Sequence, residues 1–389
     1  MKQRHLLVMM LMGTAFASCS KHDDTPGVAK PEVSITVPGG GFSVDQLQWL
    51  RINPVVKNAD KAQFYWTMGN DTLALTQNLA EVFPKAGTYT LVFTAANSAG
   101  SSKQEVVVNV GAKTYRNGVA KVFDYQPAPG QFVHEMPSWN SGDNEAAMIK
   151  RADSTLVHDG IIHLGGFGGY VVMGFDHTIR NVADSFSFTV KGNAFTNWSE
   201  PGIIQVSYDA NGNGLPDDEW YEIAGSEHGK PGTIRNYQIT YYKPNENKTP
   251  ETSDKYPYFS DTSYIRWKDN QGNKGYLSRN VFHSQPYYPQ WKGDSITFTG
   301  TRLSAENVKD QSGNGSYFVS TAVLFGYADN WANNDDKARI KISWAVDKNG
   351  QPVKLKGVDF IRVYTGVRAE GGWLGEISTE VAGVQDLNL

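Results

Sequence analysis

A chain of 389 residues is long enough for two or three domains. Aromatic residues make up 12% of it and glycines number 39, a mixture that favours strands and turns over helices. A formal net charge of -4 gives no electrostatic case for binding nucleic acid or an anionic membrane surface. A single cysteine excludes both an intrachain disulfide and a cysteine metal cluster.

Residues 1–18 have the pattern of a secretory signal peptide. Lys2 and Arg4 precede an apolar run at 6–12 that is too short to span a bilayer, and small residues follow before Cys19. The tetrapeptide 16–19 resembles the lipobox of bacterial lipoproteins, with phenylalanine in place of the usual leucine. The resemblance implies cleavage before Cys19 and lipidation of that residue, so that lipid chains anchor the protein. An unmodified cysteine in an ordinary signal peptide is the alternative.

Residues 19–30, which begin with the lipidated cysteine, read as a flexible tether. Asp23 and Asp24 follow Cys19 closely, and in Bacteroidetes such acidic residues resemble the signal that sends a lipoprotein to the outer face of the outer membrane. We therefore expect an outer-membrane protein that faces the cell exterior and touches the membrane only through its lipid anchor. A plain solvated linker would have the same composition.

Strand and turn patterns dominate residues 31–112, with strands expected at 33–37 and 62–66 and a hairpin formed by 83–97 and 101–110. A tryptophan on the second strand, Trp66, and a later Ala-Gly-Thr-Tyr-Thr strand are together similar to a PKD-like immunoglobulin sandwich. The resemblance implies a spacer or adhesion module in which Trp66 and Tyr89 belong to the core.

The remaining residues, 113–389, read as one larger β-rich domain. No segment of twelve residues keeps a convincing 3.6-residue period. Strand candidates recur at 186–190, 237–242, 295–299, 322–327, 339–344 and 358–364. The whole pattern predicts an all-β protein, in which the PKD-like sandwich precedes a larger jelly-roll-like β-sandwich that binds the ligand. The glycines of 164–169 precede a strand and no helix, so they indicate tight packing or a bulge and not a phosphate loop.

An acidic stretch at 209–219 interrupts a strand expected at 203–208. Oxygen-bearing side chains fall at its relative positions one, three and five, a glycine at six and a carboxylate at nine. This spacing is typical of a calcium loop, because a hard cation needs about six to eight oxygens around one point. The candidate ligands are Asp209, Asn211, Asn213, Leu215, Asp217 and Asp218. A turn that holds only water is the alternative, because Trp220 occupies position twelve, where an EF-hand has a glutamate.

Aromatic side chains gather in the loop regions at 256–267 and 283–291. Prolines keep these segments extended, so we expect exposed rings that stack on a planar ligand such as a sugar face or a corrin-type ring. A loop that buries its own rings is equally compatible with the sequence. The candidate ligand-binding residues are Trp267, His283, Tyr287, Tyr288 and Trp291, with Trp331 from an acidic, amide-rich loop at 329–336.

The sequence offers no catalytic constellation. The eight histidines show no metal-binding spacing, and no Gly-x-Ser-x-Gly motif is present. A glycosidase pair of carboxylates stays open, because the separation of two carboxylates is a spatial quantity. We expect a binding protein and no enzyme.

Several motifs together resemble a family of PKD-like cell-surface lipoproteins of Bacteroidetes. They lie at 164–175, 192–195, 209–227, 358–365 and 373–376. Members of that family are associated with surface uptake of cobalamin through TonB-dependent outer-membrane transporters. The resemblance therefore implies capture of a nutrient ligand, cobalamin or a related corrinoid, with such a transporter as partner.

Two alternatives remain. A glycan-binding or glycan-cleaving surface lipoprotein would use the same aromatic residues and would place paired carboxylates beside a tryptophan platform in a cleft. A structural adhesin would have flat sandwich faces and no cleft.

Overall fold

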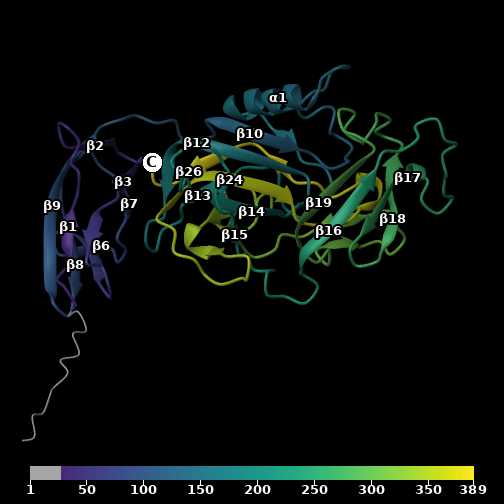
Figure 1. Ribbon diagram of the computed structural model, residues 1–389. Coiled ribbons are helices and arrows are strands. Elements are labelled where there is room, and N and C mark those ends of the chain that lie inside the picture. The colour runs from purple at the N-terminus through teal and green to yellow at the C-terminus, as the bar shows by residue number, and fades with distance from the viewer. Residues whose placement is uncertain (1–27) are drawn as a thin grey trace, which may run out of the picture. The chain divides into compact units, whose positions relative to one another are not determined.

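The computed structural model describes residues 28–389 (Figure 1). The predicted signal peptide, Cys19 and most of the predicted tether lie outside these residues. The described chain forms two compact units, one of residues 28–40, 52–79 and 90–107 and the other of 41–51, 80–89 and 108–389. Among the described residues, no helix has the length and apolar character needed to cross a membrane.

The N-terminal module is a β-sandwich-like set of short strands. A five-stranded sheet has the order β2-β9-β8-β5-β6, and two further pairs join β1 to β4 and β3 to β7. The strands are β1 (Glu32–Ser34), β2 (Phe42–Asp45), β3 (Trp49–Ile52), β4 (Val55–Lys57), β5 (Gln63–Met68), β6 (Asp71–Ala74), β7 (Leu79–Val82), β8 (Gly87–Asn97) and β9 (Gly100–Gly111). The adjacent long strands β8 and β9 confirm the expected hairpin.

The two aromatic residues expected in the core of this module differ in their burial. Trp66 is fully buried, with its ring centroid 4.9 Å from that of Phe93, so its core position is confirmed. Tyr89 is only half-buried, and its hydroxyl donates to the carbonyl of Lys85 at 2.8 Å. Such a bond to a carbonyl a few residues upstream resembles the tyrosine corner of immunoglobulin-like sandwiches.

A six-stranded antiparallel sheet of order β10-β12-β24-β14-β15-β23 forms the centre of the larger domain. Its strands are β10 (Lys121–Gln126), β12 (Tyr170–Arg180), β14 (Gly202–Ser207), β15 (Tyr221–Ile223), β23 (Ala345–Val346) and β24 (Gly357–Thr365). Side chains on the two faces of this sheet pack into two separate hydrophobic cores. Ile204 and Val363 belong to the first core, and Ile203 and Tyr364 belong to the second. Burial on both faces explains why β14, with the sequence Gly-Ile-Ile-Gln-Val-Ser, has no strict alternation of apolar and polar residues.

The first core also contains residues of a three-stranded sheet, β22-β13-β26, and of the one α-helix among the described residues. The second core contains residues of a four-stranded sheet, β18-β17-β16-β19. The elements are α1 (Glu145–Val157), β13 (Phe188–Val190), β16 (Ile234–Tyr242), β17 (Phe259–Asp269), β18 (Lys274–Asn280), β19 (Ser295–Arg302), β22 (Arg339–Ile340) and β26 (Val384–Asp386). The all-β prediction is confirmed, with stacked antiparallel sheets as in a β-sandwich.

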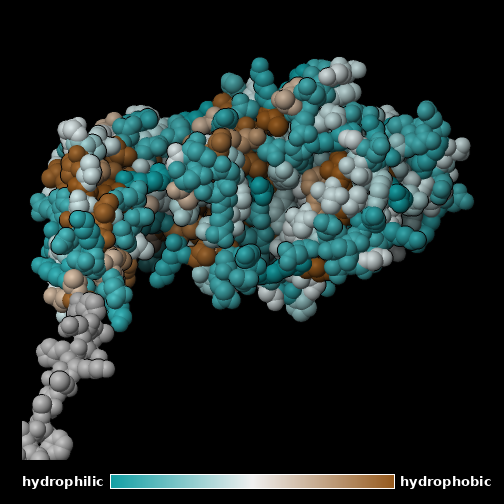
Figure 2. All heavy atoms as spheres, in the orientation of Figure 1, coloured by the Kyte–Doolittle hydropathy of each residue, from teal (hydrophilic) through white to brown (hydrophobic). Residues whose placement is uncertain are grey.

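Shorter elements complete this domain. They are β11 (Ile162–His163), β20 (Val308–Asp310), β21 (Phe318–Ser320), β25 (Glu380–Val381) and the 3-10 turns η1 (Asp336–Ala338), η2 (Ile342–Trp344) and η3 (Gly372–Leu374). On the face drawn in Figure 2, hydrophilic residues predominate and hydrophobic ones lie in separate groups between them.

Helix α1 was not expected from the sequence. It packs against β10, as Figure 1 shows, through a stripe only one residue wide, made of Met148, Ala152 and Leu156. The Asn144 side chain caps its first turn by accepting from the amide of Ala147 at 3.0 Å. A stripe this narrow gives too weak a 3.6-residue period to stand out in the sequence.

The strand expected at 322–327 is also wrong, because this segment is an irregular loop. The side chain of Asn330 accepts from the amide of Val323 and donates to its carbonyl, at 2.8 Å each. A side-chain amide therefore satisfies backbone groups that a neighbouring strand would otherwise have paired.

Candidate functional site

The larger domain contains a cleft of about 270 Å³ whose wall carries three carboxylates, Glu200, Glu376 and Glu380. Five aromatic side chains also line it: Phe132, Trp198, Phe282, His283 and Trp373. We call this hollow the acid cleft.

A wider hollow of about 430 Å³ lies beside β17 and β18. Its charged side chains are paired with one another, since Lys248 lies 2.9 Å from Asp261 and Arg279 lies 3.4 Å from Glu246. Because these charged groups already pair with each other, they do not need a ligand to satisfy them. The acid cleft is therefore the stronger candidate for a binding site.

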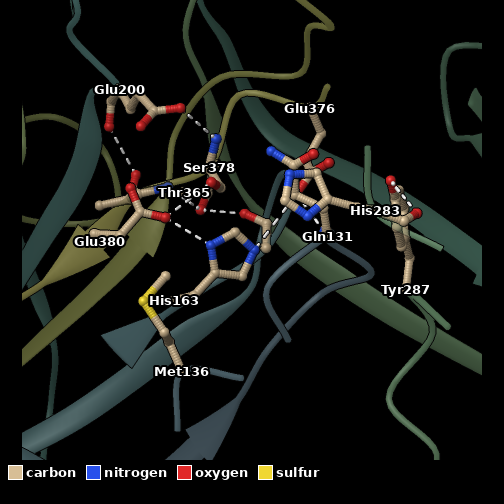
Figure 3. A network of polar contacts seen from close by, with 12 residues as sticks. Gln131, Met136, His163, Glu200, His283, Tyr287, Thr365, Glu376, Ser378 and Glu380 are labelled. Atoms are coloured by element: carbon tan, nitrogen blue, oxygen red, sulfur yellow. Dashed lines mark hydrogen bonds and ion pairs between the residues drawn. The ribbon is translucent and has the colours of Figure 1, made fainter. Parts of the chain in front are cut away.

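Strand pairing between distant segments builds the acid cleft. Strands β11 and β25 are antiparallel, and His163 lies directly opposite Glu380 in their register. Directly opposed side chains on one face of a strand pair are neighbours, so the Nδ1 atom of His163 lies 2.6 Å from Oε1 of Glu380. Glu376 and Ser378 lie on the segment that enters β25, and Glu200 lies just before β14 (Figure 3).

His163 bridges two of the carboxylates. Its Nε2 lies 3.4 Å from Oε1 of Glu376, and its side chain is fully buried. Burial lowers the pKa of this imidazole, but its contacts with Glu376 and Glu380 outweigh burial and raise the pKa to about 9. His163 is therefore a buried imidazolium at neutral pH.

Glu200, Asp329 and Glu380 form a buried triad whose ligand atoms all lie within 4.8 Å of one another. Burial, followed by the charges of Glu380 and Asp329, raises the pKa of Glu200 well above its usual value. Burial and then Glu380 likewise raise the pKa of Asp329 to about 8. Like-charged carboxylates this close cannot all ionise, so the triad keeps protons at neutral pH.

The same spacing could place three oxygens around a cation. The oxygens already have donors, however. Oδ1 of Asp329 accepts from the amides of Asn193 and Ala194 at 2.8 Å each, and its Oδ2 accepts from the amide of Glu380 at 3.0 Å. Oε1 of Glu200 accepts from the amide of Ser378 at 3.1 Å. Protons and amides therefore account for the triad without a metal.

Glu376 is the carboxylate whose hydrogen bonds are incomplete. Its Oε1 accepts from the amide of Gln131 at 2.7 Å, but its Oε2 is buried and has no partner among residues 28–389. A Cβ atom added at Gly130 would lie 2.5 Å from Nε2 of His163 and 2.8 Å from Oε1 of Glu376, so only glycine fits beside this pair. This oxygen is thus able to accept a hydrogen bond that the described residues do not supply.

Exposed aromatic rings surround the acid cleft. Phe282 is 65% exposed and meets Trp373, which is 41% exposed, edge to face at 6.4 Å between ring centroids. Phe195 is 62% exposed and stacks on Trp198 at 6.3 Å. Soluble proteins rarely leave several large rings exposed around one hollow without a binding function.

The ligand-binding residues expected from the sequence are scattered. His283 alone among them lines the acid cleft. Tyr287 and Tyr288 are fully buried and Trp267 is only 9% exposed, so the prediction that these three offer exposed rings is wrong. Tyr287 instead donates its hydroxyl to the carbonyl of His283 at 3.3 Å and so supports the turn that carries His283 (Figure 3).

The two other tryptophans expected to bind ligand do not line the acid cleft. Trp291 is half-buried and packs against the first core. Trp331 is half-buried, donates its indole N–H to the carbonyl of Val323 at 2.7 Å and lies under the ammonium group of Lys337 at 4.0 Å.

Sequence reasoning did not identify Glu200, Glu376, Trp198 or Trp373. The available signal was a glutamate two or three residues after a tryptophan, which occurs at 198–200 and 373–376 but also at 220–222, outside the acid cleft. The first two segments are too far apart in the chain for that signal to show that they meet.

The acidic loop at 209–218 brings together the side chains expected to bind calcium. The carboxylate of Asp209 accepts from the amides of Gly212, Asn213 and Gly214 at 2.8, 3.1 and 3.2 Å. Asn211 and Asn213 each donate to Asp217 at 2.9 Å, and these amides, that of Asn213 first, hold the pKa of Asp217 below its usual value. The side chains turn inward, and their carboxylate and amide oxygens are those that calcium prefers.

Two further members of the predicted calcium set lie at the same loop. Oδ2 of Asp218 accepts from the amide of Ala210 at 2.9 Å. The amide of Leu215 donates to Oδ1 of Asn213 at 2.8 Å. Hydrogen bonds of this kind also occur in loops that bind only water, so they fit calcium without requiring it.

Comparison with known proteins supports the N-terminal module. Residues 34–110 match the PKD domain family, as the Trp66 and Tyr89 motif indicated. A search of curated proteins finds no match to the chain.

Several solved structures are similar to this chain, at low sequence identity. They include carbohydrate-binding modules of the β-sandwich superfamily (10% identity, 93% of this chain and 100% of that chain, TM-score 0.18) and a SusE-like protein (8% identity, 91% and 95%, TM-score 0.25). Fibronectin(III)-like modules of Clostridium thermocellum match with 10% identity over 63% of this chain and 89% of that chain, at a TM-score of 0.18. At such identities and scores, no argument about function rests on these likenesses.

Proposed function

We propose that the protein is a surface lipoprotein whose larger domain captures a nutrient ligand in the acid cleft. The proposal rests on one observation. Glu376 lies in the wall of a cleft bordered by exposed aromatic rings, and its Oε2 is buried without a donor among the described residues. A ligand that donates to this oxygen would satisfy it, while the rings would stack on the ligand at low entropic cost. We propose binding without turnover.

Cobalamin or a related corrinoid is the first candidate ligand. The peripheral amides of a corrinoid are donors of the kind that Glu376 lacks. The ring nitrogens of His283 make no hydrogen bond within the described part of the chain, so this imidazole is available to ligate a metal. A cleft of about 270 Å³ would hold an edge of a corrinoid and not the whole molecule.

A glycan is the second candidate. Carboxylates beside tryptophans in a cleft are the arrangement expected of a glycan site, and Glu200, Glu376, Trp198 and Trp373 form such a set. A sugar residue has both hydroxyl donors for the carboxylates and an apolar face for the rings.

The cellular setting of the proposal comes from the sequence. Lipidation of Cys19 would anchor the chain to the outer membrane, and the tether with the PKD-like module would hold the acid cleft away from the lipid. A TonB-dependent transporter would receive the ligand.

Titration of a soluble form that begins at Ser20 tests the proposal. We expect saturable binding of cobalamin by calorimetry, or of a member of a panel of host and plant glycans, with the ligand recovered unchanged by chromatography. Trp373→Ala should weaken that binding tenfold or more, because Trp373 is exposed at the cleft and adds little to the core. The matched control is Tyr317→Ala, an exposed ring at 53% outside the cleft lining, which should change nothing. No binding to any ligand of either class, or binding that Trp373→Ala leaves intact, would overturn the proposal.

We further propose that the loop at 209–218 binds calcium, and chelation gives a separate prediction. Removing the ion with EGTA is expected to lower the Tm by about 5 °C or more, from ~2.7 kcal/mol at a hundredfold excess of calcium over Kd and ~2–4 °C per kcal/mol. Asp217→Asn should remove most of the calcium response, because it replaces a charged ligand with a neutral one. Differential scanning calorimetry with and without calcium measures both effects.

The loop at 310–316 supplies the matched control for the calcium prediction. The carboxylate of Asp310 accepts from the amides of Ser312 and Gly315, at 3.0 and 2.6 Å, as Asp209 does in its own loop. Asp310 is the only carboxylate of that stretch, so Asp310→Asn should leave the calcium response unchanged. A Tm that is independent of calcium in the unmodified protein would contradict the proposed site.

A further inference from the structure

The charges around the acid cleft are unbalanced. Three buried carboxylates, Glu200, Glu376 and Glu380, lie in its wall, and the described residues that line it include no lysine and no arginine. The basic side chain in contact with the carboxylates is His163. Asp329 adds a fourth carboxylate behind Glu380.

One arginine lies in a neighbouring cavity that shares Glu376 with the acid cleft. Arg368 lies with Glu370 in a separate cavity of about 80 Å³, to which Glu376 also contributes. Its guanidinium lies over the ring of Trp267 at 4.2 Å. Among the described residues no ion pair within 4.0 Å joins Arg368 to Glu376, and the Nε of Arg368 has no hydrogen-bond partner, so Arg368 is not a direct counter-ion of the acid cleft.

Protonation offsets only part of the negative charge. The protons held by Glu200 and Asp329, whose pKa values are raised, and a charged His163 leave Glu376, in the wall of the cleft, with a buried oxygen that has no donor among residues 28–389. A carboxylate accepts hydrogen bonds and donates none. In a site shielded from water, the group that satisfies it best is a donor that also carries positive charge.

The rings around the cleft favour the same kind of group. Trp198, Trp373, Phe132 and Phe282 line the cleft together with the carboxylates. Aromatic faces attract ammonium groups through the ring quadrupole, and tryptophan does so most strongly. Acidic side chains and aromatic rings around one hollow therefore both disfavour an anion.

We propose that the acid cleft selects a cationic group on its ligand, an organic ammonium such as that of an amino sugar or a primary amine, over the neutral group of the same shape. This inference rests on the proposed function, since it names the chemistry of the ligand that the cleft captures. It is independent of whether the rest of the ligand is a corrinoid, a glycan or another scaffold.

Matched amines and their N-acetyl derivatives provide the test. The probes are the tetramer of glucosamine with its fully N-acetylated form, and phenethylamine with N-acetylphenethylamine. Calorimetric titration of the soluble full-length domain pair at pH 6, where all the amino groups of these probes are largely charged, should show at least one amine binding tenfold or more tighter than its acetylated partner. If neither amine binds at least threefold tighter than its partner, including the case in which nothing binds, the inference is overturned.

Glu376→Gln provides the decisive variant. It keeps the size of the side chain and removes its charge, so the preference for the amine should fall to threefold or less. The control is Glu246→Gln, which changes a carboxylate of the wider hollow that pairs with Arg279 and should leave the preference intact. Should Glu376→Gln unfold the protein, Trp373→Ala should reduce the preference several-fold, because it removes an exposed ring without opening a core. A preference unchanged in either folded variant would overturn the inference.

The two proposals fail separately. Binding of cobalamin or of a neutral glycan that Trp373→Ala weakens, without any preference for amines, would keep the proposed function and reject a cationic group. If the unmodified protein binds no corrinoid, no glycan and no amine, both the proposed function and the inference about a cationic group are rejected.

Discussion

Replacing His163 with leucine is expected to remove about 3–5 kcal/mol from the free energy of unfolding at pH 7, because it leaves buried carboxylates without their cation. The imidazole contacts Glu380 at 2.6 Å and Glu376 at 3.4 Å, and all three side chains are buried. Urea denaturation of the variant and the unmodified protein measures the difference. His158→Leu is the control, since His158 is exposed at the end of α1, and it should change the free energy by about 0.5 kcal/mol or less.

The stabilising contribution of His163 depends on pH in a direction that its pKa shift determines. The pKa of His163 rises from 6.5 to about 9 on folding, so its stabilising contribution is full below pH 6.5 and is lost as the pH rises through 9. A shift of this size corresponds to about 3 kcal/mol at 1.36 kcal/mol per pKa unit. The difference in stability between the unmodified protein and His163→Leu should therefore shrink between pH 6.5 and 9.5. A difference that stays constant over this range would show that His163 is not a buried cation.

The fold was largely predictable because local patterns decide it. Alternation along the strands, the Trp66 strand with its later hairpin and the absence of long periodic segments all indicated stacked antiparallel sheets. The strand expected at 358–364 is β24, whose side chains reach a core on each face of the central sheet. What local patterns could not show is α1, whose buried stripe is one residue wide.

The acid cleft was not predictable, because it depends on contacts between distant parts of the chain. His163 and Glu380 are 217 residues apart and meet only through the pairing of two-residue strands, β11 and β25. Strands of two residues have no sequence period. Glu376 likewise meets the amide of Gln131, 245 residues away. A single sequence does not say which of its 40 acidic residues such pairings will bring together.

The aromatic loop at 283–291 shows that the sequence did not predict the burial of side chains outside regular strands. Prolines correctly placed Tyr287 and Tyr288 outside regular strands, but they did not indicate which way the rings point. Both rings are buried in the second core, and their hydroxyl groups donate to backbone carbonyls, that of His283 for Tyr287 and that of Gly293, at 2.7 Å, for Tyr288. A tyrosine whose hydroxyl has such a partner loses little by burial, so composition alone could not separate buried rings from exposed ones.

Gly165→Ala is expected to cost about 2–5 kcal/mol of unfolding free energy, from steric overlap of ~1–3 kcal/mol and a left-handed backbone of ~1–2 kcal/mol. Gly165 has φ +71°, and a Cβ atom there would lie 2.0 Å from the carbonyl oxygen of Ala128. That contact is with backbone, so no side chain can rotate away to relieve it. Chemical denaturation followed by tryptophan fluorescence measures the loss.

Gly313→Ala separates the two contributions to this loss. Gly313 has φ +72°, and nothing lies within 4 Å of a Cβ added there. This variant should therefore show only the backbone contribution of about 1–2 kcal/mol. Equal losses in both variants would mean that the segment around Ala128 moves freely and does not press on Gly165.

The same substitution bears on the acid cleft. The segment that Gly165 touches continues through Gly130 to Gln131, whose amide holds Oε1 of Glu376. Displacing this segment should disturb the carboxylate that faces the ligand, so a folded Gly165→Ala protein should bind the ligand of the cleft tenfold or more weakly, while Gly313→Ala binds it normally. If Gly165→Ala instead binds normally despite its lower stability, the position of Gln131 does not set the geometry of Glu376.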